Sequence, residues 1–139
     1  MNRAVITVAL ILAATTFSAT AAAGPRGDLL AGYAAAAKAA NPAMASLSAA
    51  RGKILHTKSF AGGKADTPAC TSCHGTDPRG AGRNPTGKAI DAMAVSATPG
   101  RYNDAAKVEK WFKRNCKEVL GRECSAQEKG DWLSYMVSQ

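Results

Sequence analysis

The segment with the clearest chemistry is Cys70-Thr71-Ser72-Cys73-His74, a C-x-x-C-H sequence. Two cysteines at this spacing can each form a thioether with a vinyl group of a porphyrin, and the adjacent histidine can bind the iron. The pattern is typical of a c-type haem attachment site. We therefore expect one covalent haem c on Cys70 and Cys73, with His74 as the proximal iron ligand.

Two other uses of paired cysteines fit the sequence less well. Structural zinc cysteines usually pair with about two to four residues between them, whereas Cys116 and Cys124 are separated by seven residues. A thioredoxin-like cysteine pair needs a βαβ setting, and no β-rich segment flanks Cys70. Haem attachment is the better interpretation.

The first 23 residues have the features of a secretory signal. Arg3 is followed by an apolar segment over residues 4–14 and by Ala21-Ala22-Ala23, which has the pattern of a cleavage site. The apolar segment is too short to span a bilayer, and no later one is longer. We expect a periplasmic protein without a membrane span and with one domain, residues 24–139. In that oxidising compartment Cys116 and Cys124 either form a disulfide or remain free thiols.

The chain is basic, with a formal net charge of +8. The positive residues are distributed along the sequence rather than gathered in one tract, and an exported protein rarely meets nucleic acid, so we expect no nucleic-acid partner. An acidic redox partner or an anionic surface would suit this charge. A soluble protein with solvated lysines would carry it equally well.

Hydrophobic spacing and breaking residues predict an all-α protein with loops around the haem. The attachment site is far from the C-terminus and has helices on both sides, which favours a class I cytochrome c fold over a four-helix bundle. Helices are predicted to start at Asp28, at Asn41-Pro42, near Lys88, at Asp104 and at Ser125, with the fourth ending at Gly121 and Glu128 completing a capping box in the last.

The ligand on the opposite face of the iron is the open question. Met44 and Met136 lie on apolar helix faces and are interpreted as core residues. His56 has polar neighbours in the sequence, so we interpret it as a surface histidine. Met93 is the best conventional distal ligand, although its spacing from Ile90 fits packing equally well.

One polar residue interrupts an otherwise apolar helix face after Asp104. Val108, Phe112, Asn115 and Val119 recur at helical spacing, while lysines and an arginine occupy the other face. An unpartnered buried amide costs about 1–3 kcal/mol. Asn115 is therefore expected either to bond to backbone or a buried water, or to bind the iron.

Several segments together resemble the sphaeroides haem protein family, which are monohaem class I cytochromes c with an asparagine axial ligand. The most specific match is Asn115-Cys116 followed by Gly121-Arg122-Glu123-Cys124. The similarity covers nearly all of residues 24–139. The matching segments are LLAGY at 29–33, TPACTSCHG at 67–75, TGK at 86–88, SATP at 96–99 and RYNDAAKVEKWFKRNCKEVLGRECSAQEKGDWLSY at 101–135.

The resemblance implies roles for particular residues. Cys70 and Cys73 would carry the haem thioethers, His74 would be the proximal ligand and Asn115 the distal ligand, and Cys116 would form a disulfide with Cys124. It also implies two redox partners, a dihaem c-type cytochrome donor and a membrane b-type cytochrome. A related cytochrome has a histidine at the asparagine position, so this chain resembles the oxygen-binding branch.

A weak amide ligand predicts a redox-gated site. An amide oxygen is a hard donor that suits Fe(III) better than Fe(II), so Asn115 would hold a high-spin ferric iron and leave on reduction, admitting O₂, NO or CO. The alternative is a plain electron carrier with Met93 as a permanent ligand and a low-spin iron. Catalysis at the open iron is a third possibility. No second titratable group is clearly placed for proton transfer, so the sequence does not establish an enzyme.

Overall fold

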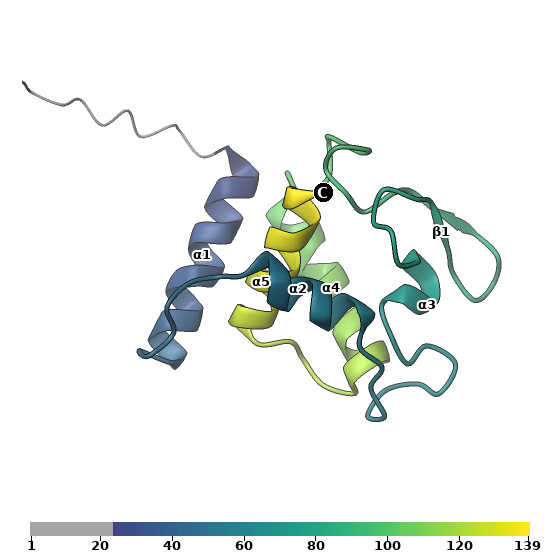
Figure 1. Ribbon diagram of the computed structural model, residues 1–139, viewed down its shortest axis with the longest axis horizontal. Helices are drawn as coiled ribbons and strands as arrows, with labels where there is room; N and C mark the ends of the chain where they lie inside the picture. The colour runs from purple at the N-terminus through teal and green to yellow at the C-terminus, as the bar shows by residue number, and fades with distance from the viewer. Residues whose placement is uncertain (1–23) are drawn as a thin grey trace, which may run out of the picture.

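A computed structural model describes residues 24–139, and the expected secretory signal, residues 1–23, lies outside this part. The described chain is mostly helical (Figure 1). None of its helices has the length and apolar character needed to cross a membrane. The elements are α1 (Pro25–Ala40), α2 (Ala49–Thr57), α3 (Thr71–His74), β1 (Gly82–Arg83), β2 (Ala89–Ile90), α4 (Ala105–Leu120) and α5 (Ala126–Ser138).

The C-terminal helix α5 is the centre of the helical part, because both α1 and α2 pack against it (Figure 1). Its buried side chains include Trp132, Leu133, Tyr135 and Met136, and the last three of these are at most 5% exposed. Burial of such large apolar side chains is the main driving force for packing the helices together. The prediction of an all-α fold with packed terminal helices is confirmed.

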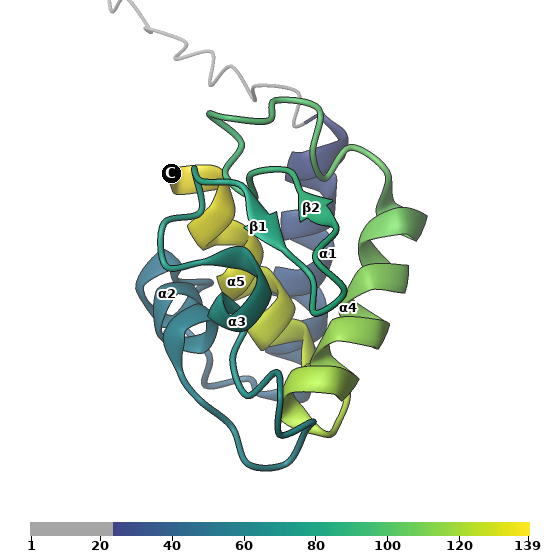
Figure 2. The same ribbon diagram turned by 90° about the vertical axis from the view of Figure 1, so that its right-hand side faces the viewer.

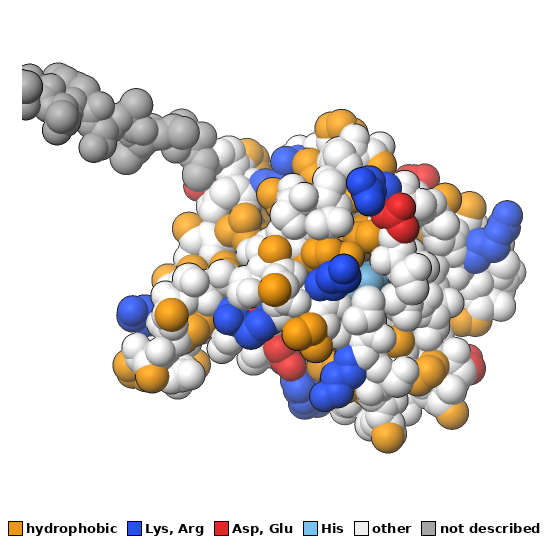
Figure 3. Space-filling model, in the orientation of Figure 1, with side chains coloured by type: hydrophobic (Ala, Val, Ile, Leu, Met, Phe, Trp, Pro, Cys, Tyr) orange, Lys and Arg blue, Asp and Glu red, His pale blue; other side chains and the backbone are white. Residues whose placement is uncertain are grey.

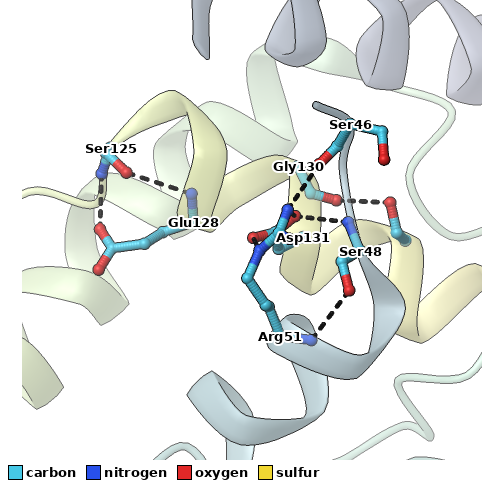
Figure 4. Close-up of polar contacts among 8 residues, drawn as sticks. Ser46, Ser48, Arg51, Ser125, Glu128, Gly130 and Asp131 are labelled. Carbon is cyan, nitrogen blue, oxygen red and sulfur yellow. Dashed lines mark hydrogen bonds and ion pairs between the residues drawn. The ribbon is translucent and has the colours of Figure 1, made fainter. Parts of the chain in front are cut away.

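The predicted boundaries of the two C-terminal helices are also confirmed. The Asp104 carboxylate accepts a hydrogen bond from the Lys107 amide at 3.0 Å, so it caps α4, which ends at Gly121. At the start of α5, Ser125 and Glu128 form the expected capping box, at 2.8 and 3.2 Å (Figure 4). Such caps depend on residues three positions apart, which is why sequence alone reveals them.

The predicted starts of the first two helices are wrong. α1 begins at Pro25, so Asp28 lies within its first turn rather than before it. Asn41 ends α1, and its side-chain Oδ1 accepts a hydrogen bond from the Ala43 amide at 3.2 Å. This local turn competes with a helix start at that point. Ser48 is the residue that caps α2.

The short helix predicted over residues 88–94 is absent from the described structure. Ala89–Ile90 instead forms β2, which pairs antiparallel with β1 (Figure 2). The Asn84 side chain accepts a hydrogen bond from the Lys88 amide at 2.8 Å, and the Asn84 amide donates to Lys88 O at 3.0 Å. These bonds close a hairpin turn, and the hairpin lies beside α3.

Candidate haem site

The C-x-x-C-H segment folds into one helical turn, α3, preceded by Cys70. The amide of His74 donates to the Cys70 carbonyl at 3.0 Å, so the ends of the motif are held together by a backbone hydrogen bond. Both Cys70 and Cys73 are free thiols. Two thiols and an imidazole therefore project from a single turn, as attachment of a haem requires.

The surroundings of the two thiols raise both of their pKa values. Burial raises the pKa of Cys70 to about 11, and burial with the nearby carboxylates of Glu118 and Asp66 raises the pKa of Cys73. Residues 24–139 contain no cluster of three or more His, Cys, Asp or Glu side chains placed to bind a metal ion.

His74 is a neutral imidazole, which is the form that binds iron. Burial lowers its pKa to about 4, with smaller effects from His56 and Arg101. Its Nδ1 atom is buried and has no hydrogen-bond partner among the described residues. The free thiols and this neutral imidazole fit a covalent haem with histidine as its proximal ligand.

Asn115 lies on the inner side of α4, as predicted. Val108 and Val119 on the same face are buried, and the lysines of the opposite face are exposed. Asn115 itself is half-buried, and its side chain forms no hydrogen bond with any residue of the described chain. The backbone hydrogen bond considered for this amide is thus not present within residues 24–139.

A disulfide joins Cys116 to Cys124, with the two Cα atoms 5.6 Å apart. Cys116 is the residue next to Asn115 and is 5% exposed. A second restraint comes from the loop before α3, where the Lys64 amide donates to the Glu118 carbonyl at 2.7 Å. The part of α4 that directly follows Asn115 is therefore held at two positions, Cys116 and Glu118.

The methionines considered as distal ligands are core residues in the structure. Met44 and Met93 are each 7% exposed and Met136 is fully buried. Met93 packs with the aromatic side chains of α5, Trp132 and Tyr135. The interpretation of Met44 and Met136 as core residues is confirmed, and Met93 has the same kind of environment.

The interpretation of His56 as a surface histidine is wrong. Its side chain is 0% exposed, and both ring nitrogens have hydrogen-bond partners, Gly75 O and Trp132 Nε1. Polar sequence neighbours misled the prediction because Thr57 points outward from α2. The signal that could have found it is the spacing of Gly52 and His56, which share the buried side of α2.

The two sets of expected ligands lie on different elements. Cys70, Cys73 and His74 belong to α3, beside the hairpin, whereas Asn115 and the disulfide belong to α4 (Figure 2). No hydrogen bond connects the two sets within residues 24–139. In the space-filling view, histidine shows as one small patch next to hydrophobic side chains near the centre of the face (Figure 3). Separate elements can supply ligands to opposite faces of one haem.

Comparison with known proteins connects this geometry to named relatives. Residues 42–136 match a family described as a domain of unknown function, DUF1924. The cytochrome c-type protein SHP of Cereibacter sphaeroides is 50% identical over 112 residues, covering 81% of this chain and 82% of that protein. Cytochrome c'' of Methylophilus methylotrophus is 34% identical over 108 residues, covering 77% of this chain and 75% of that protein.

Solved structures agree with these matches. A structure described as oxidized SHP, an oxygen-binding cytochrome c, superposes with a TM-score of 0.76 at 47% identity, covering 82% of this chain and 96% of that one. Oxidized cytochrome c'' superposes with a TM-score of 0.73 at 33% identity, covering 83% and 94%. With one covalent haem c as its cofactor, the chain belongs to the DUF1924 family and to the monohaem c-type cytochromes that include SHP and cytochrome c''.

Proposed function

We propose that the protein is a periplasmic redox-gated binder of diatomic ligands. Cys70 and Cys73 carry the haem, His74 is the proximal ligand, and Asn115 is a distal ligand that leaves on reduction. The observation that carries this proposal is the position of Asn115, which is half-buried on the same face of α4 as the buried Val108 and Val119. The solved relative described as oxygen-binding supports the same reading.

The chemistry follows from the donor atom. The haem iron supplies a centre that accepts one electron and, when ferrous, binds O₂, NO or CO. The amide oxygen of Asn115 is a neutral, hard donor that suits ferric iron and binds ferrous iron poorly. Once released, its NH₂ group can donate a hydrogen bond to a ligand in the distal pocket.

Release of Asn115 requires only local motion. The disulfide at Cys116 and the bond from Lys64 to Glu118 hold the backbone of this part of α4. Rotation about the side-chain torsions of Asn115 is enough to withdraw the amide, because no hydrogen bond to the described residues has to break. The helix itself can therefore stay in place while the distal position opens.

Electrons would come from another cytochrome. The formal charge of +8 on the whole chain favours an acidic donor. A dihaem c-type donor and a membrane b-type cytochrome are the partners that the family resemblance implies. The C-x-x-C-H motif and the disulfide at Cys116 support a periplasmic location. Haem attachment to such a motif and disulfide formation both take place outside the cytoplasm.

Visible spectra of three holoproteins test the ligand assignment. The unaltered protein should be high-spin when ferrous and should bind CO promptly after dithionite reduction. Asn115→Ala should change the ferric spectrum, whereas Asn115→His should give a low-spin ferric iron because imidazole is a stronger ligand. Lys113→Ala, on the exposed side of the same helix, is the matched control and should behave like the unaltered protein.

If the protein is instead a plain electron carrier with a permanent distal ligand, the spectra should show the opposite behaviour. A low-spin ferrous spectrum that ignores CO would show a strong permanent distal ligand and would reject Asn115. In that case Met93→Leu, rather than Asn115→Ala, should open the site to CO.

A further inference from the structure

His56 is a fully buried histidine that has no part in the proposed ligand set. It lies on α2, with Nε2 3.0 Å from the Gly75 carbonyl oxygen and Nδ1 3.3 Å from Trp132 Nε1. The ring also packs near Tyr135, with centroids 5.9 Å apart. These contacts join α2 and α5 to the residue that directly follows His74.

The partners of His56 fix the location of its proton. The indole N–H of Trp132 can only donate, so Nδ1 of His56 must accept. The hydrogen then resides on Nε2, which donates to the Gly75 carbonyl. A charged imidazolium would have no lone pair for Trp132, and burial lowers the pKa of His56 against a smaller opposing effect from the Gly75 hydrogen bond. One neutral tautomer satisfies both contacts.

Gly75 is held on both sides of its Cα atom. Its amide donates to the Thr71 carbonyl at 3.1 Å, which closes α3, and its carbonyl accepts from His56. Its φ of 68° with a ψ of 175° is a conformation that favours glycine, and α3 ends there, immediately after His74. The direction in which the chain leaves the attachment helix therefore depends on the His56 hydrogen bond.

No described residue bonds to His74 Nδ1 in a way that could orient the ring. Metal-binding histidines usually donate their second nitrogen to a carboxylate or carbonyl, which fixes the ring. In this chain His74 Nδ1 has no such partner within residues 24–139. Orientation has to come from the backbone of the turn, whose end is anchored by His56.

We propose that His56 is a positioning residue for the proximal histidine. Acting through the Gly75 carbonyl, it sets the orientation in which His74 meets the iron. This inference rests on the proposed function only for the role of His74. It assigns His56 neither contact with the haem nor transfer of a proton.

The test compares two variants that differ in hydrogen bonding. His56→Phe keeps an aromatic ring but cannot donate to Gly75, whereas the amide of His56→Gln can donate to Gly75 and accept from Trp132. The readouts are the iron–histidine stretching band of the ferrous protein by resonance Raman and its CO affinity. For His56→Phe we expect a shifted band and a CO affinity changed by about fivefold, the factor equivalent to ~1 kcal/mol or one net hydrogen bond.

The expected pattern separates positioning from simple packing. His56→Gln should restore the band and the affinity toward the unaltered values. Tyr135→Phe, which alters the same cluster but leaves the Gly75 contact, should change neither. Unchanged values in a folded His56→Phe protein, or a glutamine variant identical to the phenylalanine variant, would overturn the proposal.

One further measurement needs no variant of His56, and a second tests the assignment of His74 separately. Nitrogen-15 shifts of His56 in the unaltered holoprotein should report the Nε2–H tautomer at neutral pH, and the Nδ1–H tautomer would refute the geometry. A His74→Gly protein that kept the iron–histidine band would reject the proposed ligand set instead. Failure of the two proposals is therefore distinguishable.

Discussion

A buried carboxylate ties α5 to the start of α2, and its removal gives a quantitative test of the fold. Asp131 has 6% of its side chain exposed and accepts three hydrogen bonds (Figure 4). Two come from Arg51, at 2.7 Å from Nε and 2.9 Å from Nη2, and one comes from the Ser48 amide at 2.6 Å. Arg51 has 46% of its side chain exposed.

The unequal burial predicts unequal costs for the two partners. Arg51→Ala leaves a buried carboxylate with one donor, and breaking such a pair costs about 3 kcal/mol, the lower end of the usual range. Asp131→Asn leaves the half-exposed guanidinium in contact with water and keeps an acceptor for Ser48. We expect it to cost about 1–2 kcal/mol.

The double variant distinguishes this reasoning from a simple sum of contacts. Arg51→Ala combined with Asp131→Asn no longer contains an unpaired buried charge, so it should be more stable than Arg51→Ala alone. Guanidinium unfolding of the ferric holoprotein, followed by far-UV circular dichroism, gives the free energies. Asp77→Asn, in an exposed ion pair, is the matched amide control and should not move the midpoint.

If the double variant lost as much unfolding free energy as the two single variants lose in total, this would refute the argument. That result would mean that Arg51 and Asp131 act independently. The charge of Asp131 would then not be the reason for the cost of removing Arg51.

Two further predictions concern the pH dependence of stability and the close backbone contact between α2 and α5. Hydrogen bonds from Arg122 hold the pKa of Glu128 below its usual 4.5, so this contribution to stability is present above that pH and is lost as pH falls through the folded pKa. Unfolding free energies measured from pH 6 down to about pH 3 should therefore fall less for Glu128→Gln than for the unaltered protein. A Cβ at Gly52 would lie 2.0 Å from Asp131 O, so Gly52→Ala should lower the melting temperature or prevent folding. Gly32→Ala, in an open position of α1, should instead stabilise by about 0.5–1 kcal/mol because alanine is the better helix former; equal effects of the two substitutions in thermal unfolding would contradict this.

Features encoded over a few residues were predicted from the sequence. The Asp104 cap and the Ser125–Glu128 capping box each depend on neighbours within one helical turn, so their geometry follows from local spacing. The amphipathic face of α4 followed in the same way from its regular period. The assignment of Asn115 to the iron stays a prediction, although its missing hydrogen bond within the described chain agrees with it.

Contacts between distant segments could not be predicted in that way. His56 looked like a surface residue because its sequence neighbours are polar, and only the packing of α2 on α5 brings Trp132 and Gly75 to its two ring nitrogens. The partner of Arg51 is likewise 80 residues away. The sequence determined that a haem is attached and where the two C-terminal helices begin, because those features depend on short-range chemistry. The tertiary structure decided which polar groups are buried and with what they bond, because burial depends on which surfaces meet when the helices pack.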